Sequence, residues 1–436
     1  AGLSTTAELS PDGTHWILNG EKLWCTNGTI AELMVVMART GPRRITAFIV
    51  ETVWPGVEVV QRLHFLGLKA LENGLIRFTD VKVPVDNVLW GEGKGLKLAL
   101  VTLNTGRLTL PASAVAGGKR CLEISRRWAA ERVQWGQAVG KHDAIAQKIG
   151  RMAADLFAME AVADLASLMA DRGGTDIRLE AAMAKMWNTE MGWRMVDDTL
   201  QIKGGRGYET ADSLRSRGER PDPIERMMRD FRINLIFEGS SEIMRLFIAR
   251  EAVDTHLKVA GALIDPKTPV GAKARALLKA GLFYAGWYPR LWLGLRGRFG
   301  YGELGPLATH VRFVDRSSRK LARTLFHCMV RFGPGLEKRQ AVLGRLVEIG
   351  AELLAITAAC SRAHAMVKEN PANQGPVALA DLFSRHARRR VKERFAAVFD
   401  NDDVVTYRAA QQVLEGKHSW LEQGMVRYDT PAPERG

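Results

Sequence analysis

The sequence RDFRINLIFEGSSEI occupies residues 229–243, and the rest of the chain can be organised around it. Its first part is apolar, through Phe231, Ile233, Leu235, Ile236 and Phe237. Gly239 interrupts this run, and Ser240, Ser241 and Glu242 offer a hydroxyl N-cap and an acid for the first turn of a helix. We therefore predict that Glu238 lies at a bend between apolar residues and a helix start, where a carboxylate can act as a general base. The alternative is an ordinary solvated loop glutamate.

The first 88 residues have the pattern of β-strands. Residues 33–38 and 45–50 are short β-rich runs bounded by Gly, Pro and charges, as in an antiparallel sheet or barrel. The dipeptides Asp12-Gly13 and Asn19-Gly20 are predicted as hairpin turns. Strand alternation predicts that Trp24 and Thr26 share one face, where an aromatic plane and a hydroxyl can meet one flat ligand. The alternative for Trp24 is an ordinary buried tryptophan.

Helical periodicity begins after residue 95 and continues to about residue 257, which predicts a helical bundle. A Pro- and Gly-containing linker at 264–271 follows, and further helices are expected at 307–332, 336–368 and 377–399. The predicted fold class is therefore α+β: an antiparallel β-barrel or sandwich domain (1–90), a helical domain (91–257) and a C-terminal helical extension (258–436). The polar stretch 213–223 is expected to be an exposed loop.

Five segments resemble, in order, those of the acyl-CoA dehydrogenase family: NGEKLWCTNG (19–28), FTDVKVP (78–84), ERVQWG (131–136), QIKGGRGY (201–208) and the segment around Glu238. The resemblance covers roughly residues 1–256 and implies the family's β domain followed by its helical domain. The C-terminal helical extension is similar to that of the very-long-chain branch. The chain has no initiating Met and begins within the family's β domain, so we expect the family's N-terminal helical domain to precede it.

The resemblance implies FAD as cofactor and assigns a role to each matching residue. It implies that Glu238 is the catalytic base and that Gly106, Arg107, Phe237 and Gly239 contact the substrate. It places the FAD contacts at Trp24, Thr26, Arg132, Gln134, Trp135, Gln201, Gly204, Gly205, Ser240 and Glu242. These residue types suit the binding of a diphosphate. Arginine can donate two hydrogen bonds to it, and glycines let backbone N–H groups approach its oxygens closely. By resemblance, the Arg132 and Gln201 segments reach the FAD of a neighbouring subunit. No metal ligand set is expected.

Gly106 bears on which residue is the base. Some family members carry the catalytic carboxylate on this helix, but here the neighbouring positions are Thr105 and Gly106, so the base is assigned to Glu238. A glycine also leaves room in the pocket, which favours longer acyl chains. Arg107 follows directly, and its alternatives are a surface arginine or a guanidinium that holds a phosphate or shapes the acyl pocket.

The implied reaction is the FAD-dependent α,β-dehydrogenation of acyl-CoA to trans-2-enoyl-CoA in fatty-acid β-oxidation. Electron-transfer flavoprotein is the expected electron acceptor, and a homo-oligomer is expected, either a dimer or a dimer of dimers. Three alternatives share the fold: an acyl-CoA oxidase, a DNA-associated flavoprotein and an assembly factor.

The composition is that of a basic globular protein of 436 residues, with a net charge of +14 and a pI near 9.8. Such a charge favours polyanions, a class that includes coenzyme A. The basic residues are dispersed, so we expect no nucleic-acid ligand. Four widely spaced cysteines indicate a reducing compartment. The expected location is the cytoplasm, with peripheral contact to the inner membrane.

That membrane contact is suggested by residues 273–298, where Lys and Arg alternate with Leu, Phe, Tyr and Trp. The pattern suits a helix, broken near Pro289, that lies on an anionic membrane surface. It suits equally well an amphipathic helix that docks on its own domain.

Overall fold

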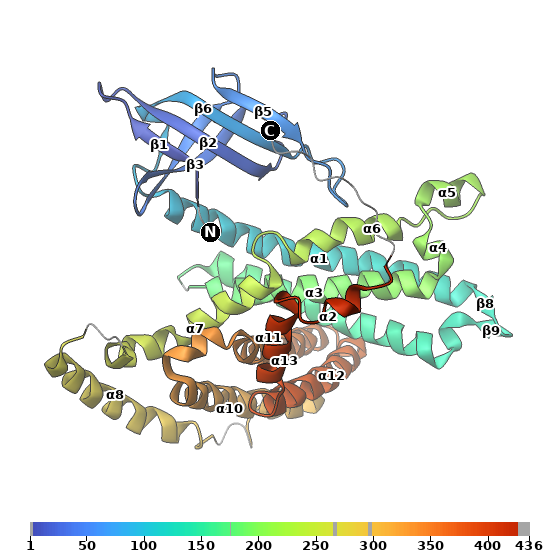
Figure 1. Ribbon diagram of the computed structural model, residues 1–436. Helices are drawn as coiled ribbons and strands as arrows, with labels where there is room; N and C mark the ends of the chain where they lie inside the picture. Colours follow the sequence, from blue (N-terminus) through green and yellow to red (C-terminus); the bar gives the residue numbers. More distant parts are fainter. Residues whose placement is uncertain (1–2, 175, 265–267, 295–298, 426–436) are drawn as a thin grey trace.

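The computed structural model describes residues 3–174, 176–264, 268–294 and 299–425 (Figure 1). A unit of β-strands at the N-terminal end lies beside a larger body of helices, so the predicted α+β class is confirmed. The helix α1 (Gly95–Glu131) leads from one to the other. At 37 residues it is about 56 Å long, so it can carry side chains to well-separated parts of the molecule.

The described strands of this unit form a seven-stranded sheet in the order β5-β6-β2-β1-β3-β4-β7. Their pairings are antiparallel, except for a short parallel contact between β1 and β3. The bounds are β1 Thr6–Leu9, β2 His15–Cys25, β3 Leu33–Gly41, β4 Arg44–Glu51, β5 Val57–Arg62, β6 Gly74–Pro84 and β7 Val88–Leu89. Side chains that alternate along the strands, including Leu18, Phe48 and Phe78, are buried in a separate hydrophobic core.

The two predicted hairpin turns have different outcomes. Asp12 and Gly13 do lie in the turn between the antiparallel strands β1 and β2. The prediction for Asn19 and Gly20 is wrong, because both residues lie inside β2. The pairing of β2 with β6 shifts register between Leu18 and Gly20, where the φ of Gly20 is 130°. The glycine therefore accommodates an irregularity within the strand, and the chain does not reverse there.

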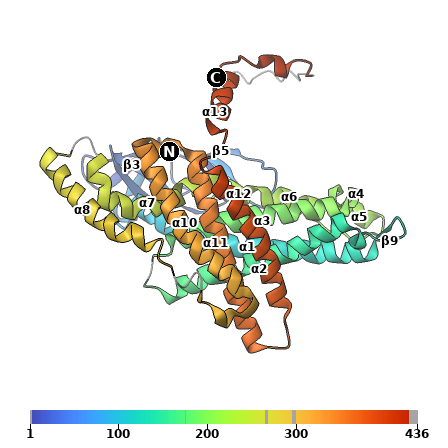
Figure 2. The same cartoon turned by 90° about the horizontal axis from the view of Figure 1, so that it is seen from below.

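In the helical body α1, α2, α6 and α7 pack on α3, and a C-terminal layer follows (Figures 1 and 2). The bounds are α2 Asp143–Arg172, α3 Arg178–Lys203, α4 Gly205–Tyr208, α5 Ala211–Ser216, α6 Ile224–Phe231, α7 Ser241–Ile264, α8 Val270–Arg290, α10 Ala308–Phe332, α11 Gln340–Glu369, α12 Gly375–Ala397 and α13 Asp403–Leu414. The three predicted C-terminal helices correspond to α10, α11 and α12. The helix α11 packs on α2, α7 and α12, so one hydrophobic core joins the extension to the preceding helices.

A β-hairpin follows α1, within the stretch whose periodicity predicted a helical bundle. Strands β8 (Val133–Gln134) and β9 (Gln137–Ala138) pair antiparallel. Trp135 and Gly136 form the connection with φ values of 48° and 80°, the left-handed geometry of a tight two-residue hairpin turn. A Gly in the second position permits this turn, and the side chain of Trp135 is left 84% exposed at its tip.

The stretch 213–223 is only in part the exposed loop that its polarity predicted, since residues 215–218, 220 and 221 are exposed. Its first part belongs to α5, which buries Leu214. Its end carries Asp222, which is buried and accepts hydrogen bonds from Lys203 at 2.8 Å and from Arg127 at 2.7 Å. The charge of Asp222 is therefore compensated inside the fold, whereas Arg215, Arg217 and Arg220 remain exposed.

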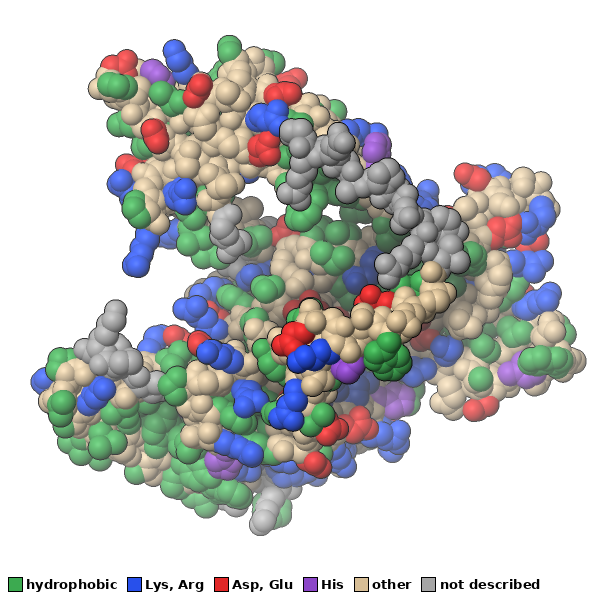
Figure 3. All heavy atoms as spheres, in the orientation of Figure 1, with side chains coloured by type: hydrophobic (Ala, Val, Ile, Leu, Met, Phe, Trp, Pro, Cys, Tyr) green, Lys and Arg blue, Asp and Glu red, His purple; other side chains and the backbone are tan. Residues whose placement is uncertain are grey.

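The strand unit is fixed against the helix that precedes Glu238. The backbone N–H of Leu68 donates to the Asp230 carboxylate at 2.6 Å, and Arg229 donates to the carbonyl of Leu66 at 3.4 Å. Gly67 lies so close to α6 that a Cβ on it would be 2.3 Å from the Arg229 carbonyl oxygen. Away from this contact, Figure 3 shows the molecule hollowed between the strand unit and the helices.

Helix α8 docks on its own chain through one face. The Tyr284 ring stacks on His256 at a centroid distance of 5.8 Å and contacts Phe326 of α10 at 4.9 Å. Leu277, Leu278 and Leu282 are exposed, so α8 also presents apolar side chains to the outside. Arg296 and Arg298, which belonged to the predicted membrane segment, and linker residues 265–267 lie outside the described residues. No described helix has the length and hydropathy required to span a bilayer.

Candidate active site

Glu238 lies at a sharp bend between a short 3₁₀ helix, Arg232–Leu235, and the start of α7. Its backbone is left-handed, with a φ of 54°, which is strained for a residue that has a Cβ. Gly239 follows with a φ of 93°, and a Cβ added there would lie 2.5 Å from the Met244 Cε. The predicted bend is therefore confirmed, and two consecutive unusual conformations hold it.

The helix start after the bend is also as predicted. The N–H of Ile243 donates to the Ser240 Oγ at 3.4 Å, and the N–H of Met244 donates to the Ser240 carbonyl at 2.8 Å. Glu242 lies in the first turn. The pKa of its carboxyl is lowered by a hydrogen bond from its own backbone N–H and then by the Ser240 hydroxyl. These residues place the positive end of the α7 dipole next to Glu238.

Helix α1 approaches the Glu238 side chain through Gly106. A Cβ on Gly106 would lie 3.5 Å from the Glu238 Oε2, so the carboxylate and this backbone are neighbours. Arg107 is only 6% exposed, and its guanidinium lies 4.6 Å from the centre of the Phe247 ring. Burial lowers the Arg107 pKa, and the charge of Glu238 acts in the opposite direction. The surface-arginine alternative is therefore wrong.

Lys185 is a residue of this site that sequence reasoning missed. It lies on α3 and has no exposed surface, and its Nζ donates to three carbonyl oxygens: Asn234 at 2.9 Å, Phe237 at 3.0 Å and Gly239 at 2.8 Å. Burial lowers its pKa to about 8, while the charge of Glu238 acts to raise it. The available signal was a lysine inside AAMAKMW, an otherwise apolar helical stretch.

A cavity of about 500 Å³ lies beside the start of α7. Two predicted cofactor residues, Ser240 and Glu242, line it, together with Arg232 and Ser241. The Arg232 Nη1 and the Ser241 Oγ are buried, and neither has a hydrogen-bond partner among the described residues. A ligand that carries hydroxyls and anionic oxygens would satisfy these groups, so the cavity fits the polar part of FAD.

The remaining predicted cofactor residues, Trp24 and Thr26 excepted, gather at the far end of α1. Arg132 and Gly205 come from separate segments but line one cavity of about 490 Å³. A Cβ on Gly204 would meet nothing within 4 Å, so the backbone there is open to a ligand. Gln134 and Gln201 are exposed at the same end. This end lies about 40 Å along α1 from Gly106, because each residue adds about 1.5 Å.

The expected pairing of Trp24 and Thr26 on one strand face is wrong. Strand β2 ends at Cys25, so Thr26 lies in the following turn. Trp24 has a φ of 60°, which breaks the alternation of side chains, and it is 67% exposed. The alternative of an ordinary buried tryptophan is also wrong. Contact of Trp24 and Thr26 with a flavin remains a prediction from the family resemblance.

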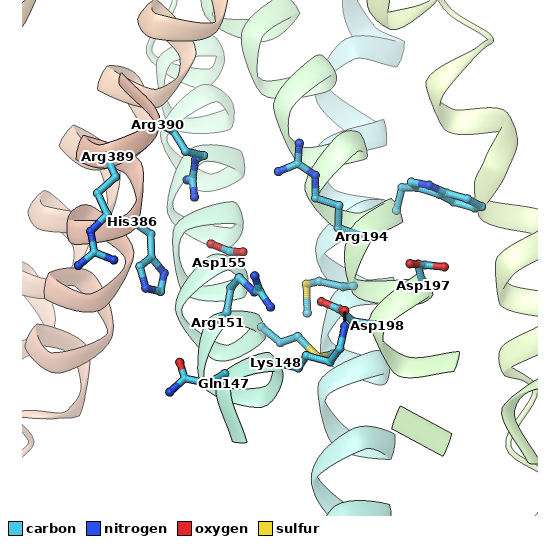
Figure 4. Close-up of a pocket in the computed structure, with 13 residues that line it drawn as sticks. Gln147, Lys148, Arg151, Asp155, Arg194, Asp197, Asp198, His386, Arg389 and Arg390 are labelled. Atoms are coloured by element: carbon cyan, nitrogen blue, oxygen red, sulfur yellow. Dashed lines mark hydrogen bonds and ion pairs between the residues drawn. The ribbon is translucent and has the colours of Figure 1, made fainter. Parts of the chain in front are cut away.

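A third cavity, of about 630 Å³, lies between α2, α3 and α12 and contains none of the predicted site residues (Figure 4). Figure 4 shows Asp155 among Arg151, Arg194 and Arg390. Asp155 is 8% exposed, and its Oδ1 has no hydrogen-bond partner among the described residues. Burial raises its pKa to about 6, opposed mainly by the charge of Arg390. No described group of three or more His, Cys, Asp or Glu side chains is arranged to hold a metal ion.

Three family models match the chain. They are "Acyl-CoA dehydrogenase, middle domain" at residues 1–81, "Acyl-CoA dehydrogenase, C-terminal domain" at 93–253, and "ACAD9/ACADV, C-terminal domain" at 306–417. The last match lies in the C-terminal extension, where the sequence resembled the very-long-chain branch.

Known proteins of similar sequence agree with these matches. The chain is 52% identical over 435 residues to the probable acyl-CoA dehydrogenase FadE10 of Mycobacterium tuberculosis, covering 98% of this chain and 67% of that protein. It is 31% identical over 418 residues to the human mitochondrial very long-chain specific acyl-CoA dehydrogenase, covering 91% of this chain and 60% of that one.

Among solved structures, the acyl-CoA dehydrogenase from Bacillus anthracis complexed with FAD superimposes with a TM-score of 0.73 at 27% identity, over 94% of this chain and 68% of that one. The chain thus spans about two thirds of the length of FadE10 and of this solved protein. With the bend at Glu238 and the two cavities that carry predicted FAD contacts, these matches establish that the chain belongs to the acyl-CoA dehydrogenase family, whose members are FAD-dependent oxidoreductases.

Proposed function

We propose that this protein oxidises acyl-CoA to trans-2-enoyl-CoA in fatty-acid β-oxidation, with Glu238 as the base that removes the α-proton. The observation that carries the proposal is the position of the Glu238 carboxylate, at a strained bend and against the bare backbone of Gly106. No side chain at position 106 separates the carboxylate from a ligand that enters beside α1. FAD, when bound, accepts the hydride that leaves the β-carbon.

The α-proton of a thioester is a weak acid, so the protein has to stabilise the negative charge that develops on the thioester oxygen. In our proposal the backbone N–H of Glu238 donates to that oxygen while the carboxylate of the same residue takes the proton. Phe237 and Gly239 flank the reacting carbon, and Arg107 shapes the pocket behind Glu238. Phe237, Glu238 and Gly239 are partly buried, so a bound substrate would complete the exclusion of water and be held in one orientation against the base.

Two groups of residues are proposed to hold FAD. Ser240 and Glu242, which line the cavity beside the start of α7, would serve the FAD of their own chain, and Trp24 and Thr26 would contact it from the strand unit. The second group is Arg132, Gln134, Trp135, Gln201, Gly204 and Gly205, about 40 Å away along α1. This distance supports a homo-oligomer, at least a dimer, in which the second group contacts the FAD of the neighbouring subunit.

The test of the proposal is Glu238→Gln, which keeps the size of the side chain and removes the base. The variant should still bind FAD, but reduction of the flavin by acyl-CoA should slow by about 10²–10⁴-fold. Glu8→Gln, at an exposed position of β1, is the control for a change of one charge. Anaerobic bleaching of the flavin absorbance measures the rate, and bleaching of Glu238→Gln at the rate of the unchanged protein would reject the assignment.

The electron acceptor distinguishes a dehydrogenase from an oxidase. We propose electron-transfer flavoprotein as the acceptor, and peroxide formation in air without it would favour an acyl-CoA oxidase. Tight, salt-sensitive binding of duplex DNA without flavin reduction would favour the DNA-associated alternative. A chain that binds FAD and a partner protein but leaves acyl-CoA unchanged would favour an assembly factor.

Contact of α8 with a membrane is a separate part of the proposal. The exposed side chains of Leu277, Leu278 and Leu282 and the neighbouring Lys273 and Lys279 form the surface expected of an interfacial helix. Changing the three leucines to serine should abolish flotation with vesicles that contain anionic lipid. Equal recovery of the two proteins would remove the membrane contact.

A further inference from the structure

All the N–H donors of the Lys185 ammonium bind the loop that carries Glu238. A lysine has three N–H donors, and here the acceptors are the carbonyls of Asn234, Phe237 and Gly239 at 2.8–3.0 Å. Two of the three acceptors belong to the residues on either side of Glu238. The lysine comes from α3, so one rigid helix holds the loop at three points.

The hydrogen bond to Phe237 also determines where an N–H points. In a trans peptide the C=O and the following N–H point to opposite sides of the chain. Because the Phe237 carbonyl is directed at Lys185, the N–H of Glu238 is directed away from it. That N–H has no acceptor among the described residues.

We propose that Lys185 is a positioning residue for the reaction, which aims the Glu238 N–H at the thioester oxygen by holding the Phe237 and Gly239 carbonyls. This inference rests on the proposed function, because it gives that N–H a substrate to bind. The proton passes from the α-carbon to the Glu238 carboxylate, and the C–H electron pair moves into the enolate. Lys185 acts on this step through the backbone alone and touches no reacting atom.

The buried surroundings of Lys185 explain why the hold is strong. Burial is the main cause that lowers its pKa, to about 8, since an ammonium without water is unfavourable. Glu238, Glu190 and Glu242 act in the opposite direction, and Arg107 acts with burial. Three carbonyl acceptors replace the lost water, so the charged form has every donor satisfied.

The experiment measures removal of the α-proton separately from hydride transfer. In an acyl-CoA with sulfur at the 3-position, the β-position carries no hydrogen, but the α-proton can still be removed and exchanged. Deuterium uptake at the α-carbon of this analogue from D₂O, on the full-length FAD-loaded protein, follows the step by mass spectrometry. In Lys185→Met we expect uptake to slow by about 10²-fold, the usual effect of losing one donor to an oxyanion, while binding of the analogue changes little.

Two further variants separate positioning from charge and from general damage. Lys185→Arg keeps the positive charge, but its planar fork cannot supply three donors to one point, so uptake should remain slow. Lys148→Met removes another lysine that contacts α3, where it pairs with Asp198, and uptake should be unchanged. If Lys185→Met does not bind FAD, Lys185→Arg provides the test.

Each outcome is decisive. Uptake at the unchanged rate in Lys185→Met, or full recovery in Lys185→Arg, would overturn the positioning role. Uptake that survives in Glu238→Gln would instead reject the proposed base, so the two failures are distinguishable. Independently of FAD, amide hydrogen exchange of residues 233–240 should be faster in Lys185→Met than in Lys148→Met.

Discussion

The Glu238 carboxylate lies 3.5 Å from the position that a Cβ on Gly106 would occupy, although the two residues are far apart in the sequence. This is ordinary van der Waals contact, so position 106 forms part of the wall around the base. A glycine there leaves the wall open. The size of residue 106 should therefore control what fits beside the carboxylate.

Gly106→Leu should shift the preferred acyl chain towards shorter lengths. The leucine fills space beside Glu238 that a longer acyl chain would occupy. A pocket that is too small by one methylene group changes kcat/KM by about 10-fold or more. The measurement is kcat/KM for a series of acyl-CoAs of graded length. Gly150→Leu on α2, where a Cβ meets nothing within 4 Å, is the matched control. A uniform loss for all lengths would contradict the prediction.

Gly239→Ala should reduce both stability and turnover. Its φ of 93° is unfavourable for alanine, and the new Cβ would lie 2.5 Å from the Met244 Cε, so we expect a loss of about 1–3 kcal/mol. Gly271→Ala, in the first turn of α8 and with no neighbour within 4 Å, should instead be neutral or slightly stabilising. Thermal unfolding of both variants shows whether the stability falls in Gly239→Ala but not in Gly271→Ala.

Arg132→Ala should weaken FAD binding by about 10–100-fold, because a hydrogen bond to a charged group contributes about 1.5–3 kcal/mol. Arg126→Ala, an exposed arginine on the preceding turn of α1, should leave the affinity unchanged. Titration of the flavin-free protein with FAD gives both values. If the arginine serves the neighbouring subunit, the affinity of the unchanged protein should also fall on dilution below the range where the oligomer persists.

Asp155→Asn should stabilise the protein at neutral pH. The folded pKa of Asp155, about 6, lies above its ordinary value of 3.8, so the folded protein holds this proton more tightly. Its contribution to stability is complete below pH 3.8 and is lost as the pH rises through 6. At pH 7.5 the asparagine variant should therefore be more stable by about 1–3 kcal/mol, since each pKa unit corresponds to about 1.4 kcal/mol.

The same comparison at pH 4 should show little difference, because the carboxyl is then protonated in both folded and unfolded chains. Asp197→Asn, an exposed carboxylate on the same cavity, serves as the control. Thermal unfolding at the two pH values is the measurement. An equal change in Tm at both would show that the burial of Asp155 is not the cause.

Local patterns predicted the regular elements well. Strands β3 and β4 and helices α10, α11 and α12 follow from two- and 3.6-residue periodicity, since each element buries one face of its own sequence. The errors fell where tertiary contacts outweigh local preference. Asn19-Gly20 stays within a strand because β6 pairs with it, and Asp222 is buried because Lys203 and Arg127 compensate its charge.

By itself, the sequence determined that Glu238 lies at a bend, because Gly239 breaks the chain and Ser240 caps the next helix. Only the tertiary structure decided what surrounds this carboxylate: Gly106 from α1 beside it, and Lys185 from α3 holding its loop. Both residues are distant along the chain, and their approach depends on how whole helices pack. Periodicity reports which face of a helix is buried but not which partner it meets.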